Sequence, residues 1–296
     1  MDPQYHAEFL QKIGHRIREC HGHLWFDIFP KAYTTIPYDA DVDSATFQTA
    51  DVLGDDGLMV RYSCSVDSGV ASFQHVVTDK QYGMATLVNK ARNKTRQGLR
   101  NCEAGQIDPV DLGSEGIQLH ADTIIRQGRK LPNNFESYWK AYFAAASESP
   151  AATAWAARHE GRLAAYLISF RAGSTEYVSI VRSSQEKLKF RPNNAMLFTY
   201  LEHTMARPEI SEVSIGLQSL QPGSESLDLF KRGMGFVERP IGQRIELRPG
   251  ILATLPRPIA AAAAKTLKYL PGGEKKARLT GALSWYASQP QIQRAA

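Results

Sequence analysis

Cysteine is scarce in this sequence, with only Cys20, Cys64 and Cys102 among 296 residues. An odd and widely spaced set does not form the disulfide framework of a small secreted protein. Apolar runs such as Ile259 to Ala264 fall far short of the roughly 20 residues that cross a bilayer. The first residues carry an acid at Asp2 and no unbroken apolar stretch, unlike a secretory signal. We therefore expect a soluble, cytoplasmic protein with reduced thiols.

Clusters of metal ligands and nucleotide fingerprints are also missing. Cys20, His21 and His23 have the residue types of metal ligands, but no second cluster follows at the spacing of a zinc site, so we expect no metal. The segment Gly233-Met234-Gly235 is too short for a dinucleotide fingerprint, and no predicted strand leads into it.

The charge is unevenly distributed along the chain. The net charge is +5, and hydrophobic residues make up 43%, which is typical of a globular protein of one or two domains. Residues 249–296 contain seven basic side chains and one acid, so the remaining residues carry a net charge of only −1. We expect an acidic partner or a membrane surface to contact residues 251–296, and we expect no general nucleic-acid binding by the rest.

Hydrophobic periodicity predicts mixed structure in the first half of the chain. A helix is expected from Ala7 to Cys20. Strands are expected at 24–29, 58–66 and 70–77, and helices at 84–102, about 117–125 and 135–146.

The second half of the chain shows a more regular order. Strands are predicted at 153–158, 163–170 and 177–181, followed by a helix from 191 to about 205. A strand at 212–217, a short helix at 224–232 and a strand at 243–247 complete the order β-β-β-α-β-α-β. Pro192 suits the first turn of the long helix, where a missing N–H costs little.

This order is the core order of the GNAT-fold acyltransferases, and three motifs point to a subgroup. The segment Leu229-Phe230-Lys231-Arg232-Gly233-Met234-Gly235-Phe236 resembles the FK-x-x-F/M-G-F signature of FemAB-like proteins. Residues 84–100 resemble a basic helix in the first half of that family, and Arg191-Pro192-Asn193-Asn194-Ala195 lies where its polar-capped helix begins. The resemblance covers roughly residues 76–248.

The resemblance implies an α/β (α+β) fold with a GNAT-like mixed sheet flanked by helices. It also implies two tandem GNAT-like halves. We expect a divergent first half at 1–146, an acyltransferase half at 147–250 and a basic helical tail at 251–296.

An N-acyltransferase function follows from the same resemblance. The donor would be acetyl-CoA or another acyl-CoA, and the acceptor would be a primary amine of a small or cell-envelope-directed metabolite. Strand backbone at Val178 and Ile180 would pair with the donor. The helix start at Asn193, Asn194 and Ala195 would offer N–H groups to an anion, and Arg191 would add a charged contact.

The expected catalytic residues are Lys231 and Tyr177. The lysine matches a family position and would stabilise a developing oxyanion electrostatically. The general base stays open between Tyr177, Glu176, Asp122 and a water relay. The glycine-rich Q/R-x-x-G-x-G/A loop of typical CoA-binding members is absent, which leaves the identity of the donor open.

Two other functions stay open. One is an aminoacyl-tRNA-dependent transferase of the peptidoglycan-bridge type, although no inserted helical arm is visible. The basic face of the helix at 84–102 would then bind RNA phosphates, and otherwise it is a solvated face. The other is a non-catalytic GNAT-fold protein that only binds a ligand.

Overall fold

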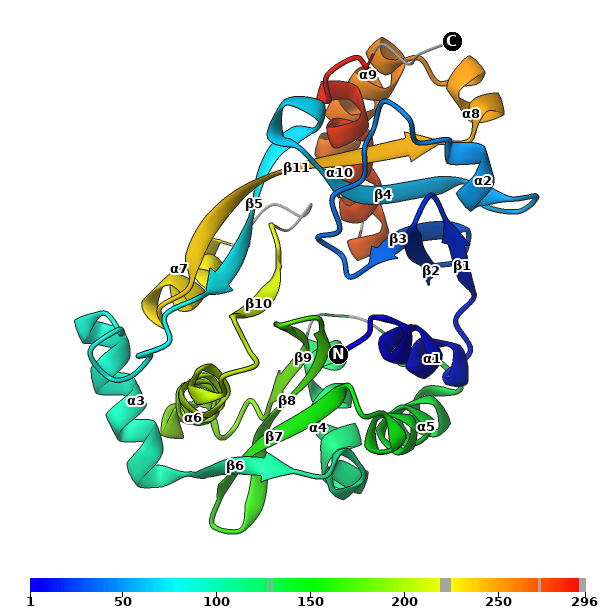
Figure 1. Cartoon of the computed structure of the whole chain (residues 1–296). Coiled ribbons are helices and arrows are strands. Elements are labelled where there is room, and N and C mark those ends of the chain that lie inside the picture. Colours follow the sequence, from blue (N-terminus) through cyan, green and yellow to red (C-terminus); the bar gives the residue numbers. More distant parts are fainter. Residues whose placement is uncertain (127, 129, 219–224, 271–272, 293–296) are drawn as a thin grey trace. The chain divides into compact units, whose positions relative to one another are not determined.

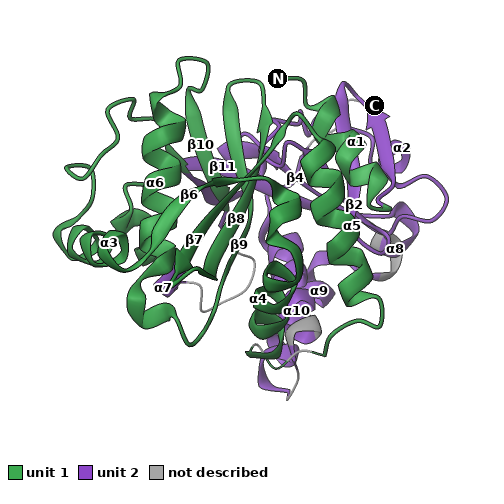
Figure 2. Cartoon of the chain, turned by 90° about the horizontal axis from the view of Figure 1, so that it is seen from below, with its two compact units in different colours: residues 1–14, 76–216, 228–237 green, residues 15–75, 217–227, 238–296 purple. Residues whose placement is uncertain are grey.

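The computed structural model describes residues 1–126, 128, 130–218, 225–270 and 273–292. The chain divides into two compact units, coloured separately in Figure 2. Unit 1 contains residues 1–14, 76–216 and 228–237, and unit 2 contains residues 15–75, 217–227 and 238–296. Each unit combines three separate segments of the sequence. The expected division of the chain into two GNAT-like halves, at 1–146 and 147–250, and a tail at 251–296 remains a prediction.

Unit 1 contains a mixed sheet with the strand order β10-β9-β8-β7-β6 (Figure 1). Only the β9–β10 pair is parallel among the pairs in this series. The strands are β6 (Glu103–Ile107), β7 (Ala152–His159), β8 (Arg162–Ala172), β9 (Thr175–Ser183) and β10 (Glu212–Leu217). The helices are α1 (Gln4–Lys12), α3 (Asn89–Asn101), η2 (Pro109–Leu112), α4 (Gly113–Arg126), α5 (Phe135–Glu148), η3 (Leu188–Phe190), α6 (Pro192–Ala206) and most of α7 (Glu225–Gly233).

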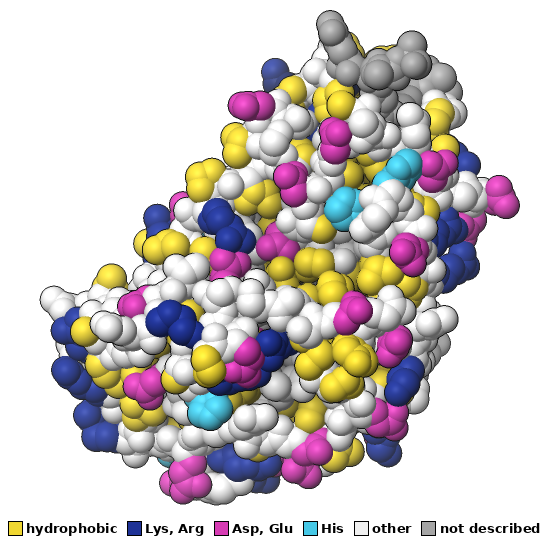
Figure 3. All heavy atoms as spheres, viewed as in Figure 1, with side chains coloured by type: hydrophobic (Ala, Val, Ile, Leu, Met, Phe, Trp, Pro, Cys, Tyr) yellow, Lys and Arg dark blue, Asp and Glu magenta, His cyan; other side chains and the backbone are white. Residues whose placement is uncertain are grey.

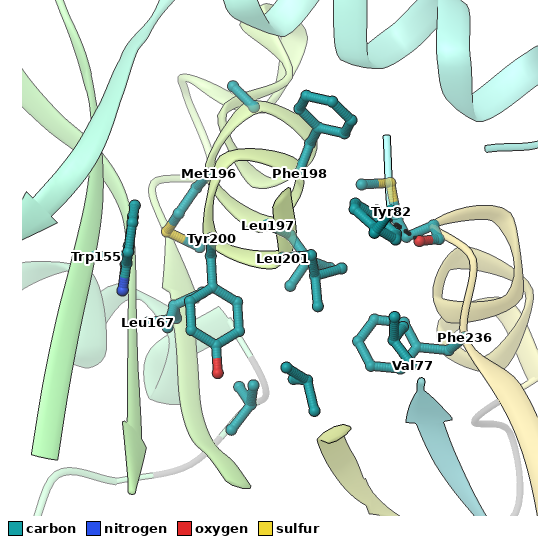
Figure 4. Close-up of a cluster of buried hydrophobic side chains, with 14 of the residues drawn as sticks. Val77, Tyr82, Trp155, Leu167, Met196, Leu197, Phe198, Tyr200, Leu201 and Phe236 are labelled. Carbon is teal, nitrogen blue, oxygen red and sulfur yellow. Dashed lines mark hydrogen bonds between the residues drawn. The ribbon is translucent and has the colours of Figure 1, made fainter. Parts of the chain in front are cut away.

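Helices cover both faces of this sheet because successive side chains of a strand point to opposite sides. On one face, Trp155 and Leu167 pack with α6, and the Trp155 and Tyr200 rings lie 5.7 Å apart (Figure 4). On the other face, Tyr166 contacts Phe143 of α5, and Phe170 of β8 contacts α1. The sheet is therefore buried on both sides, and its functional groups must reach solvent at strand ends or at gaps between strands.

Unit 2 contains strands in the order β1-β2-β3-β4-β11-β5, with both parallel and antiparallel pairs. Trp25, Phe47 and Tyr62 form the centre of one of its cores. The strands are β1 (Ile17–Cys20), β2 (His23–Phe29), β3 (Ala32–Ile36), β4 (Met59–Cys64), β5 (Val70–Val77) and β11 (Val237–Leu247). The helices are α2 (Thr49–Leu53), η1 (Val66–Ser68), α8 (Pro249–Thr254), α9 (Arg257–Tyr269) and α10 (Glu274–Ser288).

The basic tail folds onto unit 2 and contributes to its core. Ala260 of α9 and Tyr286 of α10 pack with Ile245 of β11. The side chain of Gln289 also binds Ile245, accepting from its N–H at 3.0 Å and donating to its carbonyl at 2.9 Å. The tail thus supplies part of the interior of unit 2.

Most expected elements are present, including the whole β-β-β-α-β-α-β order from β7 to β11. The expected helix from Ala7 to Cys20 is wrong in its second part. Helix α1 ends at Lys12, and Ile17–Cys20 instead pairs with β2 in a hairpin. Gly14, which lies between the two elements, has a φ of +95°, a conformation that favours glycine. Among the described residues, none of the helices is long and apolar enough to cross a membrane.

Candidate functional site

Strands β9 and β10 separate after a short parallel start. They pair only at Thr175–Tyr177 against Glu212–Ser214, although β9 continues to Ser183 and β10 to Leu217. Parallel strands that diverge in this way leave peptide groups along the opening that a ligand can pair with in an extended conformation. Val178 and Ile180, the expected donor contacts, lie in the separated part of β9.

A β-bulge lies at the start of this opening. Across β8, Val178 pairs with Ser169 and Ile180 pairs with Ile168, so Ser179 has no residue opposite it. A bulge re-aims backbone groups and is common beside active sites. The Ser179 side chain is exposed and hydrogen-bonds Tyr142 of α5. The sequence signal for Ser179 was a single polar residue within the apolar stretch from Tyr177 to Val181.

Arg191 occupies a strained position at the start of α6. Its backbone is left-handed, with φ 62° and ψ 40°, which costs a non-glycine residue roughly 1–2 kcal/mol. Its carbonyl accepts from the N–H groups of Asn194 and Ala195 at 3.1 and 3.2 Å. The predicted helix start at Pro192 is confirmed.

Helix α3 packs closely over the first turn of α6. A Cβ on Gly98 would lie 2.6 Å from the Arg191 carbonyl oxygen and 3.1 Å from the Ala195 nitrogen. Asn194 and Ala195 are buried, whereas Arg191 and Asn193 are partly exposed. A ligand arriving from solvent therefore meets Arg191 and Asn193 first.

Two polar atoms at this turn are buried without a partner among the described residues, the Nε of Arg191 and the Oδ1 of Asn193. The amide nitrogen of Asn193 donates to Ser183 Oγ at 3.1 Å, which holds that side chain against the end of β9. An unsatisfied guanidinium N–H is suited to an anion, since leaving it buried and unpaired costs free energy.

Lys231 lies in the last turn of α7 and is buried, with its side chain 8% exposed. Burial lowers the pKa of this lysine, and the Asp228 carboxylate, 3.8 Å from the ammonium, opposes that effect. One turn later, Met234 Sδ accepts from the Asn194 amide at 3.4 Å. The end of α7 is therefore joined to the start of α6, and the structure brings these two predicted segments together.

The expected base candidates differ in their surroundings. Tyr177 is buried and is the last β9 residue paired with β10. Glu176 is also buried, and burial raises its pKa, while hydrogen bonds from Ser169 and the charge of Arg207 oppose the rise. Asp122 is exposed on α4. The identity of the general base, with Tyr177 and a water relay among the candidates, therefore remains a prediction.

A buried polar cluster that the sequence did not reveal lies on the α4–α5 side of the sheet. Arg182 Nη2 donates to His120 Nε2 at 3.2 Å, and His120 Nδ1 lies 3.3 Å from Tyr166 Oη. Burial, with the Arg182 charge, lowers the pKa of His120 to about 3, so this imidazole is neutral at pH 7. The described residues contain no group of three or more His, Cys, Asp or Glu placed to hold a metal ion.

Residues 89–222 match the family model described as an acetyltransferase (GNAT) domain. That match includes α3, β6, α4 and α5, which all begin before residue 147. The crystal structure of FemX is similar, with 13% identity, a TM-score of 0.57, and coverage of 85% of this chain and 93% of that one. Similar too is the C-terminal domain assigned to a lysylphosphatidylglycerol synthetase of Agrobacterium fabrum, with 10% identity, a TM-score of 0.56, and coverage of 85% and 90%.

No curated protein matches the sequence. The match of residues 89–222, the separated strands and the bulge identify a domain of the GNAT acetyltransferase type in this part of the chain. The fold over most of the chain is similar to that of FemX.

Proposed function

We propose that this protein is an N-acyltransferase that moves an acyl group, in first place acetyl, from an acyl thioester to a primary amine. The acceptor would belong to a small or cell-envelope-directed metabolite. The observation that carries the proposal is the separation of β9 from β10 next to the Ser179 bulge. The opening exposes backbone to the donor at the point where the bulge re-aims peptide groups.

The backbone along Val178 and Ile180 would hold the donor in an extended conformation. The peptide N–H groups at the bulge would donate to the acyl oxygen, where negative charge develops during attack by the amine. Donors that are already in place stabilise this charge without reorganising, and losing one costs about 100- to 1000-fold in rate. Lys231 would add positive charge, and Tyr177 or a water relay would take the proton of the amine.

The residues at the start of α6 fit an acyl-CoA donor through Arg191. Its buried Nε–H lacks a partner among the described residues and would donate to a phosphate oxygen. Asn193 would border the same group, whereas Asn194 and Ala195 would act from behind as part of the helix terminus. When bound, acyl-CoA would supply a thioester that an amine can cleave, with the thiol as leaving group.

Thiol release from acetyl-CoA and longer acyl-CoAs, measured with a panel of primary amines, tests this function. Binding of each donor is measured in parallel by calorimetry. The proposal predicts both donor binding and amine-dependent thiol release. Absence of both would reject the thioester donor. Mass spectrometry of small molecules that co-purify with the protein would identify a retained donor or acceptor.

A second candidate is transfer from an aminoacyl-tRNA, and the exposed basic face of α3 favours it. Lys90, Arg96 and Arg100 are exposed on α3, whereas its buried residues are Ala91, Thr95 and Gly98. Lys189 lies beside this helix, since Gln97 donates to its carbonyl at 3.4 Å. Figure 3 shows Lys and Arg side chains gathered at the lower left, where α3 lies in Figure 1.

Salt-dependent binding of charged tRNA would separate this candidate from the first. Each phosphate contact contributes a slope of about −0.9 to the dependence of log affinity on log salt for duplexes. The double variant Arg96→Ser/Arg100→Ser should therefore flatten the slope by roughly two. A variant at exposed Arg162, outside α3, is the control. Equal slopes in all three proteins would reject the tRNA candidate.

A further inference from the structure

Unit 2 contains a pocket of about 300 Å³ that the proposed acyl transfer does not use. The loop before β4, the end of β4, and strands β5 and β11 enclose it. A volume of this size suits a small ligand, because ligand pockets begin at about 300 Å³. The charged and polar side chains that line it include Asp39, Asp41, Gln74 and Arg239.

One wall of this pocket presents a positively charged group that other side chains hold in place. Arg239 Nη2 donates to Gln74 Oε1 at 2.5 Å and lies 3.5 Å from Asp39 Oδ2. Gln74 Nε2 in turn donates to the same Asp39 oxygen at 2.7 Å. Gln74 is only 1% exposed, yet the Arg239 side chain remains 45% exposed. The guanidinium is thus oriented before any ligand arrives, and a planar fork of this kind matches a carboxylate.

The rest of the pocket lining carries a net negative charge. Asp41 is exposed, and Asp39 has its charge balanced by Arg239, so the pocket keeps a surplus of one carboxylate. The thiol of Cys64 adds no charge, because burial raises its pKa to about 11. Val66, Pro240 and Ile241 supply apolar surface. A ligand that satisfies all three features carries a carboxylate, an ammonium group and a short apolar chain.

We propose that this pocket binds a zwitterion of amino-acid size, with its carboxylate on Arg239 and its ammonium group on Asp41. The site does not depend on the acyl transfer proposed for unit 1. The pocket would therefore bind its ligand even if this protein has no acyltransferase activity.

Three probes with the same carbon skeleton test the proposal: norleucine, which carries both charges, hexylamine, which carries only the ammonium group, and hexanoate, which carries only the carboxylate. Binding to the full chain is measured by calorimetry and by saturation-transfer NMR. Norleucine should bind about five- to tenfold more tightly than either single-charge probe, as expected for one added charge-assisted contact at a partly exposed site.

Two substitutions should separate the contribution of the ammonium contact from that of the carboxylate contact. Asp41→Asn should weaken norleucine and hexylamine about five- to tenfold and should not weaken hexanoate. Arg239→Met should weaken norleucine and hexanoate but not hexylamine, because it removes the positive charge and leaves both carboxylates. Asp55→Asn, which makes the same charge change on an exposed loop outside the pocket, should alter none of the three.

Arg239→Met also removes the partner of Asp39, so its thermal midpoint is measured alongside binding. If that variant unfolds, Asp41→Asn decides the question alone, since Asp41 lies at the surface. Equal affinity for the three probes, no saturable binding of norleucine at millimolar concentration, or an unchanged preference in Asp41→Asn would overturn the proposal.

Discussion

Replacing Gln289 by Ala should destabilise unit 2, although Gln289 lies beyond the last helix. The side chain is 4% exposed and forms two hydrogen bonds with one residue of β11, Ile245, which is itself 1% exposed. The carboxamide therefore acts as a neighbouring strand would. Ala removes both partners and leaves a buried N–H and a buried carbonyl unsatisfied.

The size of the effect follows from these two groups. Each unsatisfied buried group costs about 1–3 kcal/mol, and release of the glutamine side chain returns about 1–2 kcal/mol of conformational entropy. Their central values give a net loss of about 2.5 kcal/mol, a large share of the roughly 5–15 kcal/mol that stabilises a typical domain. The backbone contacts of Gln289, such as its carbonyl with Arg257 Nη1 at 2.7 Å, remain in the variant.

Urea unfolding followed by tryptophan fluorescence measures this loss, because Trp25 and Trp285 both lie in unit 2. Gln291→Ala, at an exposed position two residues later, is the matched control and should stay within about 0.5 kcal/mol of the parent. A loss below that limit in Gln289→Ala, with an unchanged unfolding slope, would refute the reasoning. It would mean that water or a shifted backbone satisfies Ile245 at little cost.

Three further predictions concern the site, the buried imidazole and the tail. Lys231→Met should lower kcat/KM for acyl transfer about 100-fold, whereas Met at the exposed neighbour Arg232 should leave it near the parent value, and equal activity of both variants would contradict a catalytic lysine. The pKa of His120 is lowered to about 3 by burial, so the unfolded chain binds a proton near pH 6.5 that the folded chain binds only near pH 3. Stability is therefore full above that window and falls with pH inside it, and His120→Gln should show a smaller loss than the parent between about pH 7 and about pH 5 in urea unfolding; a parallel loss would argue against this assignment. Finally, the exposed Lys265 and Lys268 of α9 should draw the tail to anionic membranes. Replacing both by Glu should weaken binding to phosphatidylserine vesicles at least tenfold, at about 1 kcal/mol per lysine, and no difference from neutral phosphatidylcholine vesicles would remove the membrane as a partner.

The sequence did not predict strands β3 and β6, and each was missed for its own reason. All five residues of β3 are buried, so the strand shows no alternation of polar and apolar positions. Strand β6, Glu103–Ile107, has the sequence Glu-Ala-Gly-Gln-Ile and little intrinsic preference for a strand. It forms because β7 offers a partner along its whole length. Neither cause is local in the sequence.

In the candidate site, too, some features could be predicted from the sequence and others could not. The motif around Lys231 and the polar start of α6 at Arg191 were identifiable because short segments carry them. The bulge at Ser179 was not, because it exists only in the register between β8 and β9. The covering of Asn194 and Ala195 was hidden too, since it depends on the approach of Gly98 from a helix about 90 positions earlier.

The sequence by itself determined the order of helices and strands from β7 to β11 and the concentration of positive charge in the tail. These properties depend on hydrophobic periodicity, turn residues and composition, which near neighbours in the chain encode. Only the tertiary structure decided which backbone groups open between β9 and β10, that Gln289 completes β11, and that Asp41 and Arg239 line one pocket. Each of these depends on strand register or on a contact between distant segments, and no local pattern specifies either.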